Sequence, residues 1–313
     1  MVEPMKRPIR VGLIQQAGLT SDLAENKRAL LAQIRELSTK ADYVMPTELS
    51  YTPYFGMLRD ESLRGWAEKI EGSFLAEVGA IAAREKTTIL APVYLACEDG
   101  TYANAVVVFG PDGKLVAGHT KTRSTEGFYK KVHLPYFWRN GRGLDEAFYF
   151  QRGDAFPVFD TPKAKIGILI CYDRRFPEAW RSLALEGAEI VFMPSCIPAW
   201  NPSALASTSD MFVAELRTRA CENGNFVVAC NRAGKQIFRE FETPFIGASC
   251  VIDPAGGVLQ QLSSSAAESV VVTFDLYEMT RVRRRLALLE DRRVDAYEIS
   301  GTVKPAATPE RAP

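Results

Sequence analysis

Apolar stretches typical of buried strands alternate with amphipathic stretches typical of helices along most of the chain. Residues 9–16 (IRVGLIQQ) predict the first strand, and residues 22–37 predict a helix in which Asp22 and Glu25 have the spacing of a capping box. This alternation predicts an α/β fold, in which helices cover sheets. The further predicted strands are residues 88–96, 102–110, 114–120, 165–171, 189–195, 225–231 and 249–254, and the further predicted helices are 74–86, 179–189 and 209–224.

The length and composition of the chain predict one domain. Its 313 residues, of which 47% are hydrophobic, can bury a single large core, and we assign residues 1–300 to that domain. Residues 301–313 are rich in proline and alanine, so we expect them to form a mobile tail or an arm that wraps a partner.

The balance of charges argues against two classes of partner. Lys and Arg number 38 and Asp and Glu number 38, so no long-range field attracts nucleic acid or an anionic membrane. The basic run at residues 281–293 has acidic neighbours and is interpreted as a solvated helix face. No stretch approaches the roughly 18 apolar residues that span a bilayer, and the N-terminal residues lack an apolar secretory segment. We therefore expect a cytoplasmic protein.

The cysteines predict neither a zinc site nor a disulfide framework, and we expect no metal. They are widely scattered and none has CxxC spacing. The six positions are Cys97, Cys171, Cys196, Cys221, Cys230 and Cys250.

Three separated segments carry candidate chemistry. Cys171 lies where an apolar run meets an amphipathic segment, which places its thiol beside the first N–H groups of a helix. Glu48 follows the apolar residues 43–45, where a carboxylate is costly to desolvate unless it is paired or used. Lys131 lies in the otherwise apolar stretch 127–137. Thiol, carboxylate and ammonium together supply the nucleophile, the base and the oxyanion-binding cation of acyl transfer.

Simpler interpretations exist for each of these residues. A free cysteine is usually a small buried hydrophobe, and a lysine pair at a strand surface is usually only solvated. The chain has only two histidines, His119 and His133, so a cysteine–histidine mechanism is poorly supplied.

The three segments resemble the nitrilase superfamily of carbon–nitrogen hydrolases. The matching motifs are PTEL around Glu48, YKKVHLP around Lys131 and ICYDRRFPEAWR around Cys171, and the resemblance extends from IRVGLIQQ to DRRVDAY. It implies an α/β four-layer αββα sandwich. It also implies that Glu48 is the general base, Lys131 the oxyanion-stabilising cation and Cys171 the nucleophile.

The resemblance adds a second carboxylate and an oxyanion donor. The stretch LDEAFYFQRGDAFPVFD matches the family segment that carries a second active-site glutamate, here Glu146; the alternative is an exposed loop glutamate. The backbone N–H of Tyr172 is expected to bind the oxyanion together with Lys131. Lys130 is one position off the motif, and on a strand it points to the opposite face. The cation and the helix N-terminus are expected to lower the cost of forming the Cys171 thiolate, and no cofactor is needed.

The residues after the nucleophile indicate a small-molecule substrate with a carboxylate. Arg174 and Arg175 follow Asp173, and guanidinium groups match carboxylates in bidentate fashion. The alternative is that they form ion pairs with Asp173, Glu178 or a neighbouring helix. The doubled arginine resembles the N-carbamoyl-D-amino-acid hydrolase branch of the family.

Four more residues complete the predicted substrate-binding set: Tyr54, His133, Trp200 and Asn201. Tyr54 and Trp200 belong to a predicted aromatic wall. The loop at residues 195–210 departs from the carbamoylase pattern, because it lacks that pattern's histidines and has Trp200 where one is expected, whereas Asn201 matches. The side-chain preference and the chirality of the substrate stay open.

Three functions compete on these grounds. The first is hydrolysis of the carbamoyl group of an N-carbamoyl amino acid or amine, which releases ammonia and carbon dioxide. The second is a carboxamide amidase or nitrilase with the same triad, and the third is a non-catalytic scaffold. The family resemblance implies a homodimer or higher homo-oligomer, paired through helices near the nucleophile and through the C-terminal segment.

Overall fold

The computed structural model describes residues 6–139, 142–199 and 208–297. The predicted tail at 301–313 and the predicted substrate-binding residues Trp200 and Asn201 lie outside these ranges.

The first of two large sheets has seven strands in the order β18-β1-β2-β4-β5-β7, and β3 pairs with β4. β1 runs parallel to β2 and antiparallel to β18, so the last strand of the described chain lies beside the first. The bounds are β1 Pro8–Gln15, β2 Tyr43–Pro46, β3 Glu68–Lys69, β4 Thr88–Ala96, β5 Tyr102–Phe109, β7 Phe128–Lys130 and β18 Glu268–Asp275.

The second large sheet has seven strands in the order β17-β16-β13-β12-β11-β10-β6, with β11, β12 and β13 parallel. The bounds are β6 Gly118–His119, β10 Val158–Asp160, β11 Lys165–Ile168, β12 Ile190–Ser195, β13 Phe226–Asn231, β16 Cys250–Ile252 and β17 Val258–Gln261. Two small hairpins pair β8 Tyr136–Arg139 with β9 Arg142–Asp145, and β14 Lys235–Phe238 with β15 Phe241–Pro244.

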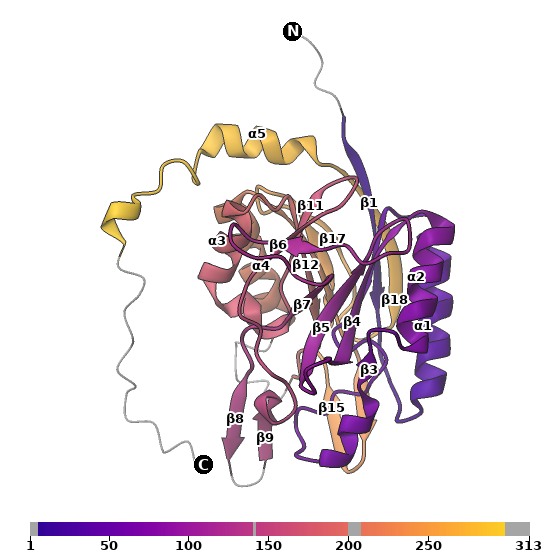
Figure 1. Cartoon of the computed structure of the whole chain (residues 1–313). Coiled ribbons are helices and arrows are strands. Elements are labelled where there is room, and N and C mark those ends of the chain that lie inside the picture. The colour runs from indigo at the N-terminus through magenta and orange to yellow at the C-terminus, as the bar shows by residue number, and fades with distance from the viewer. Residues whose placement is uncertain (1–5, 140–141, 200–207, 298–313) are drawn as a thin grey trace.

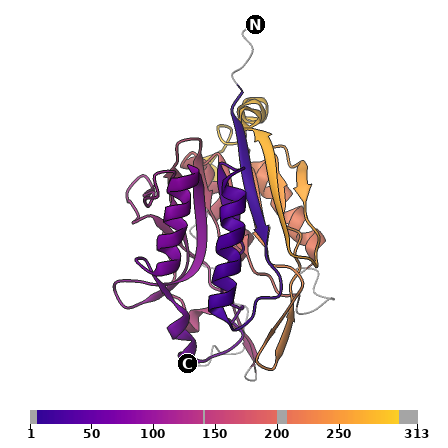
Figure 2. The same ribbon diagram turned by 90° about the vertical axis from the view of Figure 1, so that its right-hand side faces the viewer.

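Helices form the two outer layers. α1 Leu23–Ser38 and α2 Ser73–Glu85 cover the first sheet, and α3 Pro177–Leu185 and α4 Ser209–Asn223 lie on the opposite side of the molecule, against the second sheet (Figures 1 and 2). The order of layers is αββα, so the predicted four-layer sandwich is confirmed. Short 3₁₀ helices in the described ranges are η1 Glu61–Trp66, η2 Glu146–Phe148, η3 Cys171–Arg175 and η5 Val294–Ala296.

The layers are held by two large apolar clusters. One joins the facing sides of the two sheets, for example Leu13 and Met45 with Val191, and extends to α3 and α4. The other packs α1 and α2 on the first sheet, for example Ile34 and Val78. Strands buried on both faces explain why so many predicted strands read as continuous apolar runs.

Helix ends follow the sequence signals closely. The Asp22 side chain accepts from the N–H of Glu25 at the start of α1, and α4 ends at Gly224, which has φ +62°. The strand predicted at 114–120 is wrong for most of its length, because only Gly118 and His119 pair in a ladder, as β6.

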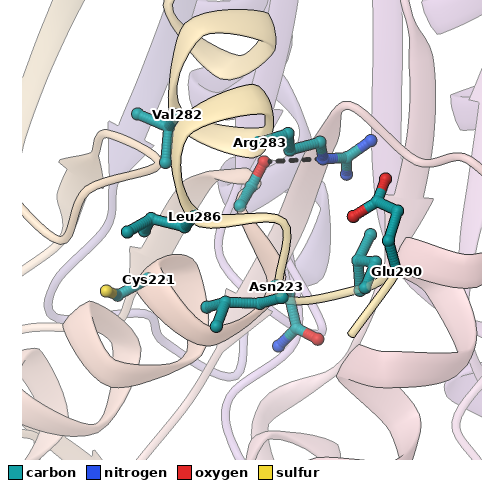
Figure 3. A pocket seen from close by; sticks show the side chains of 9 residues that line it. Cys221, Asn223, Val282, Arg283, Leu286 and Glu290 are labelled. Carbon is teal, nitrogen blue, oxygen red and sulfur yellow. Dashed lines mark hydrogen bonds between the residues drawn. The ribbon is translucent and has the colours of Figure 1, made fainter. Parts of the chain in front are cut away.

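α5 Tyr277–Leu286 carries the basic run, and one of its arginines turns inward. Nε of Arg283 donates to the carbonyl of Gly224 at 3.1 Å, and its terminal nitrogen donates to Ala188 O at 3.0 Å. Figure 3 shows this contact beside Cys221 and Leu286, where α5 meets the end of α4. Arg281, Arg284 and Arg285 are exposed, as the prediction of a solvated face requires.

No helix in the described ranges has the length and apolar character that crossing a membrane requires. Within the same ranges, no group of three His, Cys, Asp or Glu side chains could hold a metal ion.

Candidate active site

Glu48 lies in the turn that follows β2, and its side chain is fully buried. The next residue, Leu49, has φ +51°, a left-handed conformation that turns the chain sharply after the strand. Oε1 of Glu48 accepts from Nδ2 of Asn104 at 2.7 Å and from Nζ of Lys131 at 2.8 Å.

Lys131 directly follows β7 and is also fully buried, whereas Lys130 is half-buried on the other face. Its ammonium lies between two carboxylates: besides Glu48 it contacts Glu146 Oε2 at 2.7 Å and Oε1 at 3.0 Å. Glu146 begins η2 and is 1% exposed, so the alternative of an exposed loop glutamate is wrong.

Cys171 lies three residues after the end of β11 and opens η3. Its φ of +47° makes a tight turn, and its side chain is buried. In the first turn of a helix the N–H groups have no partner within the helix, so an oxyanion contact stays a prediction for the N–H of Tyr172.

Asp173 ties this turn to the segment that carries Lys131. Its fully buried carboxylate accepts from Ile170 N at 3.0 Å, from the Tyr129 hydroxyl at 2.7 Å and from His133 N at 2.9 Å, and it contacts His133 Nδ1 at 2.8 Å. Because Ile170 precedes the cysteine and His133 follows the lysine by two residues, Asp173 fixes one segment relative to the other.

The buried charges act on one another. Burial lowers the pKa of Lys131, but Glu146 and Glu48 outweigh it and hold that pKa well above its ordinary value. Burial raises the pKa of Glu146 to about 7, with Lys131 opposing the rise. Burial, and then Glu48, raises the pKa of Cys171 to about 12, although Lys131 and Arg174 lower it. The nearby cations therefore lower the cost of forming the thiolate, as expected, but burial and Glu48 outweigh them and favour the neutral thiol.

A sequence profile described as carbon-nitrogen hydrolase matches residues 10–284 of the chain. The chain belongs to the carbon–nitrogen hydrolase family. Accordingly, it is a hydrolase that acts on non-peptide carbon–nitrogen bonds.

Individual members of the family match the chain over nearly its whole length. It is 30% identical over 305 residues to the N-carbamoylputrescine amidase of Arabidopsis thaliana, which covers 95% of this chain and 96% of that protein. It is 27% identical over 292 residues to the citrullinase of Francisella tularensis, with 93% and 97% covered. The crystal structure of a carbon–nitrogen hydrolase from Helicobacter pylori G27 superposes with a TM-score of 0.80 at 27% identity, covering 93% of this chain and 97% of that one.

The side chains of Tyr54 and His133 both contact other side chains of the protein. The Tyr54 hydroxyl donates to Glu146 Oε1 at 3.0 Å and its ring is buried, and a substrate contact stays a prediction for Tyr54. The His133 ring stacks on Phe176 with centroids 3.5 Å apart and contacts Asp173 through Nδ1. Its other edge lies beside a pocket, so a substrate contact stays a prediction for His133.

That pocket has a volume of about 650 Å³. Val132, Ala147 and Tyr172 contribute to its wall, and they are the chain neighbours of Lys131, Glu146 and Cys171 respectively. The pocket therefore adjoins the segments that carry Lys131, Glu146 and Cys171. The exposed Arg152 also lines it.

The two predicted carboxylate-binding arginines contact an acidic residue of α4. Nε of Arg174 donates to Glu215 at 3.1 Å and its terminal nitrogen donates to the carbonyl of Cys171 at 3.0 Å, while Arg175 lies 3.3 Å from the same Glu215 oxygen. Arg174 is 4% exposed and supports the nucleophile turn through its contact with the Cys171 carbonyl, and a substrate contact stays a prediction for it. Arg175 is more exposed and stays a candidate.

Sequence reasoning missed Asn104 and Arg232, and gave Asp173 only a neighbour's role. The sequence did contain a signal for both missed residues. Asn104 is a polar residue within the apolar run that forms β5, and Arg232 directly follows the apolar run that forms β13. A fully buried polar side chain in such a place requires hydrogen-bond partners, and those partners turn out to belong to the Glu48 segment.

Proposed function

We propose that the protein is a cysteine-dependent amidohydrolase that removes the carbamoyl group from an N-carbamoyl amino acid or amine and yields the free amine, carbon dioxide and ammonia. The observation that carries this proposal is the buried Glu48–Lys131–Glu146 cluster acting electrostatically on the Cys171 thiol. Similarity over nearly the full length to proteins named N-carbamoylputrescine amidase and citrullinase supports the carbamoyl group as the target.

In the first half-reaction Glu48 takes the proton of the Cys171 thiol while the sulfur attacks the carbamoyl carbon. The tetrahedral oxyanion is stabilised by the charge of Lys131 and by the backbone N–H of Tyr172. The C–NH₂ bond breaks, and Glu48 returns the proton to the departing ammonia. The product is a thioester-like S-carbamoyl enzyme that still carries the amine portion.

In the second half-reaction Glu48 activates a water molecule, which attacks the same carbon and displaces the sulfur. The released N-carboxy compound loses carbon dioxide and leaves the free amine. Overall, one water molecule is consumed. Glu146, bonded to Lys131 and to the Tyr54 hydroxyl, keeps the ammonium beside the reacting carbon in both steps.

A substrate with an acidic end fits the surroundings of the nucleophile. Arg174, Arg175 and Glu215 together carry a net charge of +1, and Arg152 adds a second cation at the wall of the adjoining pocket. We assign substrate contacts to Arg175 and, on the family pattern, to His133, Trp200 and Asn201.

The test is a panel of N-carbamoyl amino acids, citrulline, N-carbamoylputrescine, simple carboxamides and nitriles, with ammonia and carbon dioxide measured together. A carbamoylase releases both in equal amounts, whereas an amidase or a nitrilase releases ammonia alone. Cys171→Ala is expected to abolish turnover, and Cys250→Ala, which removes a buried thiol on β16, is expected to leave turnover unchanged. Ammonia without carbon dioxide identifies the amidase or nitrilase alternative, and silence across the panel favours the scaffold.

We also propose that the protein is a cytoplasmic homodimer or higher homo-oligomer. All six cysteines are free, which suits a reducing compartment. Several apolar side chains are exposed on α3, α4 and the segment after α5, which is where the family resemblance places subunit contacts: Leu185, Met211, Leu288, Val294 and Tyr297. Sedimentation velocity of the full chain tests the assembly, and a single monomeric species at micromolar concentration contradicts it.

A further inference from the structure

The two oxygens of the Glu48 carboxylate have different surroundings. Oε1 accepts from Asn104 and from Lys131. Oε2 is buried and has no hydrogen-bond partner among the described residues. A buried carboxylate oxygen without a donor is costly, so a second group is expected to use it. Under the proposed function, that group is the thiol proton of Cys171.

Asn104 forms hydrogen bonds to both Glu48 and Lys131. It lies on β5 and is fully buried. Its side-chain amide donates to Glu48 Oε1, and its main-chain carbonyl accepts from Lys131 N at 2.9 Å. An amide NH₂ donates permanently and takes up no proton, so it keeps Oε1 in the role of acceptor.

Arg232 holds the main chain of Glu48 and of the turn that follows it. It directly follows β13 of the second sheet and is fully buried. One terminal nitrogen donates to the carbonyls of Glu48 and Leu49, both at 3.0 Å, and the other donates to Thr52 O at 3.1 Å and to Gln236 Oε1 at 3.2 Å.

Burying a guanidinium group costs desolvation free energy, and hydrogen bonds to neutral carbonyls offset only part of that cost. No ion pair joins Arg232 to a carboxylate within the described ranges, and its Nε has no partner there. Its contacts converge on the turn in which Leu49 adopts φ +51°. Left-handed backbone at a non-glycine residue is strained by about 1 kcal/mol or more and persists where its surroundings enforce it.

We propose that Asn104 and Arg232 are positioning residues for Glu48. Asn104 fixes the carboxylate through one oxygen, and Arg232 fixes the main chain that carries it, so that Oε2 alone is presented to the Cys171 thiol. This inference rests on the proposed function in one respect, which is that Glu48 acts as the base.

The first test replaces Asn104 with Leu, which has a similar volume and no donor. The matched control is Asn225→Leu: Asn225 is equally buried, its Nδ2 donates to Ala188 O, and its Oδ1 likewise has no partner in the described chain, but its contact lies away from Glu48. Loss of one hydrogen bond to a charged group is expected to lower kcat of Asn104→Leu about 10- to 100-fold, with KM changed less than about threefold. Asn225→Leu is expected to lose stability and to keep its kcat.

The second readout needs no substrate. Iodoacetamide labelling of Cys171, followed by peptide mass spectrometry, measures how readily the thiol loses its proton, and the half-buried Cys97 in the same chain is the internal standard. Labelling of Cys171 relative to Cys97 is expected to fall in Asn104→Leu by a factor similar to that in Glu48→Gln. Because this assay is independent of the substrate, it stands even if the carbamoyl assignment fails.

Arg232 is tested with Arg232→Met and Arg232→Lys. The control is Arg283→Met, because Arg283 also donates to two main-chain carbonyls, as Figure 3 shows for one of them. We expect Arg232→Met to lose kcat and Cys171 labelling together, and Arg232→Lys to recover part of both. If Arg232→Met does not fold, Arg232→Lys and Asn104→Leu carry the test. Wild-type labelling in folded Asn104→Leu, or an equal loss in Asn225→Leu, overturns the proposal.

Discussion

Replacing Lys131 with Met removes a buried cation without shortening the side chain much. In the described structure Lys131 is the one cation within hydrogen-bond distance of the carboxylates of Glu48 and Glu146, and all three side chains are at most 1% exposed. The variant therefore leaves two buried carboxylates facing each other with no compensating charge.

The expected cost follows from breaking a buried ion pair. Removing one partner typically destabilises a protein by about 3–5 kcal/mol, because the remaining charge stays buried and unpaired. Lys131 joins two carboxylates, so we expect Lys131→Met to lie at the upper end of that range above pH 7. Activity is expected to be lost as well, since one oxyanion donor contributes about 3–4 kcal/mol to transition-state stabilisation.

The loss of stability in Lys131→Met is expected to increase with pH. The pKa of Glu146 is raised from 4.5 to about 7 in the folded protein, so its contribution to stability is complete below about pH 4.5 and disappears as pH rises through 7. Lys131 opposes that rise, so in Lys131→Met the pKa of Glu146 is expected to lie higher still. The destabilisation of the variant relative to wild type is therefore smallest near pH 5 and largest near pH 8.

Urea unfolding of both proteins at pH 5, 6, 7 and 8 measures this difference. The double variant Lys131→Met/Glu146→Gln serves as the control, because it removes one of the two stranded charges and is expected to be more stable than Lys131→Met at pH 8. A destabilisation that is the same at all four pH values, or a double variant that is no more stable, refutes the reasoning.

Three further predictions concern the nucleophile turn and a helix end. Asp173→Asn weakens the hydrogen bonds to Tyr129 and His133, and kcat is expected to fall about tenfold with little change in KM. Alkylation of Cys171 is expected to keep accelerating between pH 8 and 10, because burial raises its pKa to about 12. Gly224→Ala is expected to lower the unfolding free energy by about 1–2 kcal/mol, because φ is +62° and a Cβ lies 2.8 Å from Arg283 Cγ.

Each of these has a simple check. Steady-state kinetics that leave kcat of Asp173→Asn at the wild-type value contradict the role of that carboxylate. A plateau in Cys171 labelling above about pH 9 contradicts the raised pKa of its thiol. For Gly224→Ala the control is Gly65→Ala, where an added Cβ meets nothing within 4 Å, and equal unfolding free energies for the two variants argue against strain at the helix end.

The sequence predicted those features that are determined by residues close together in the chain, such as helix ends. The Asp22 cap of α1 and the end of α4 at Gly224 are confirmed because each is decided within four residues. The choice of Lys131 over Lys130 used the position of the family motif and the alternation of faces along a strand, and the structure buries Lys131 as expected.

What the sequence could not predict depends on packing between distant elements. The contact of Arg174 with Glu215 joins η3 to α4 across 41 residues, and that of Tyr54 with Glu146 spans 92 residues. The raised pKa of Cys171 depends on the depth of its burial, which no local pattern states. These features depend on which residues meet in three dimensions, and the hydrophobic pattern along the chain does not predict that.

The reacting groups come from different sheets: Glu48 and Lys131 follow β2 and β7 of the first, whereas Cys171 follows β11 of the second. Neither sheet on its own holds a complete set of groups for the reaction. Enzymatic activity during refolding therefore requires that the two sheets have packed against each other. We expect activity to return after the far-ultraviolet circular dichroism signal, which reports secondary structure, has recovered.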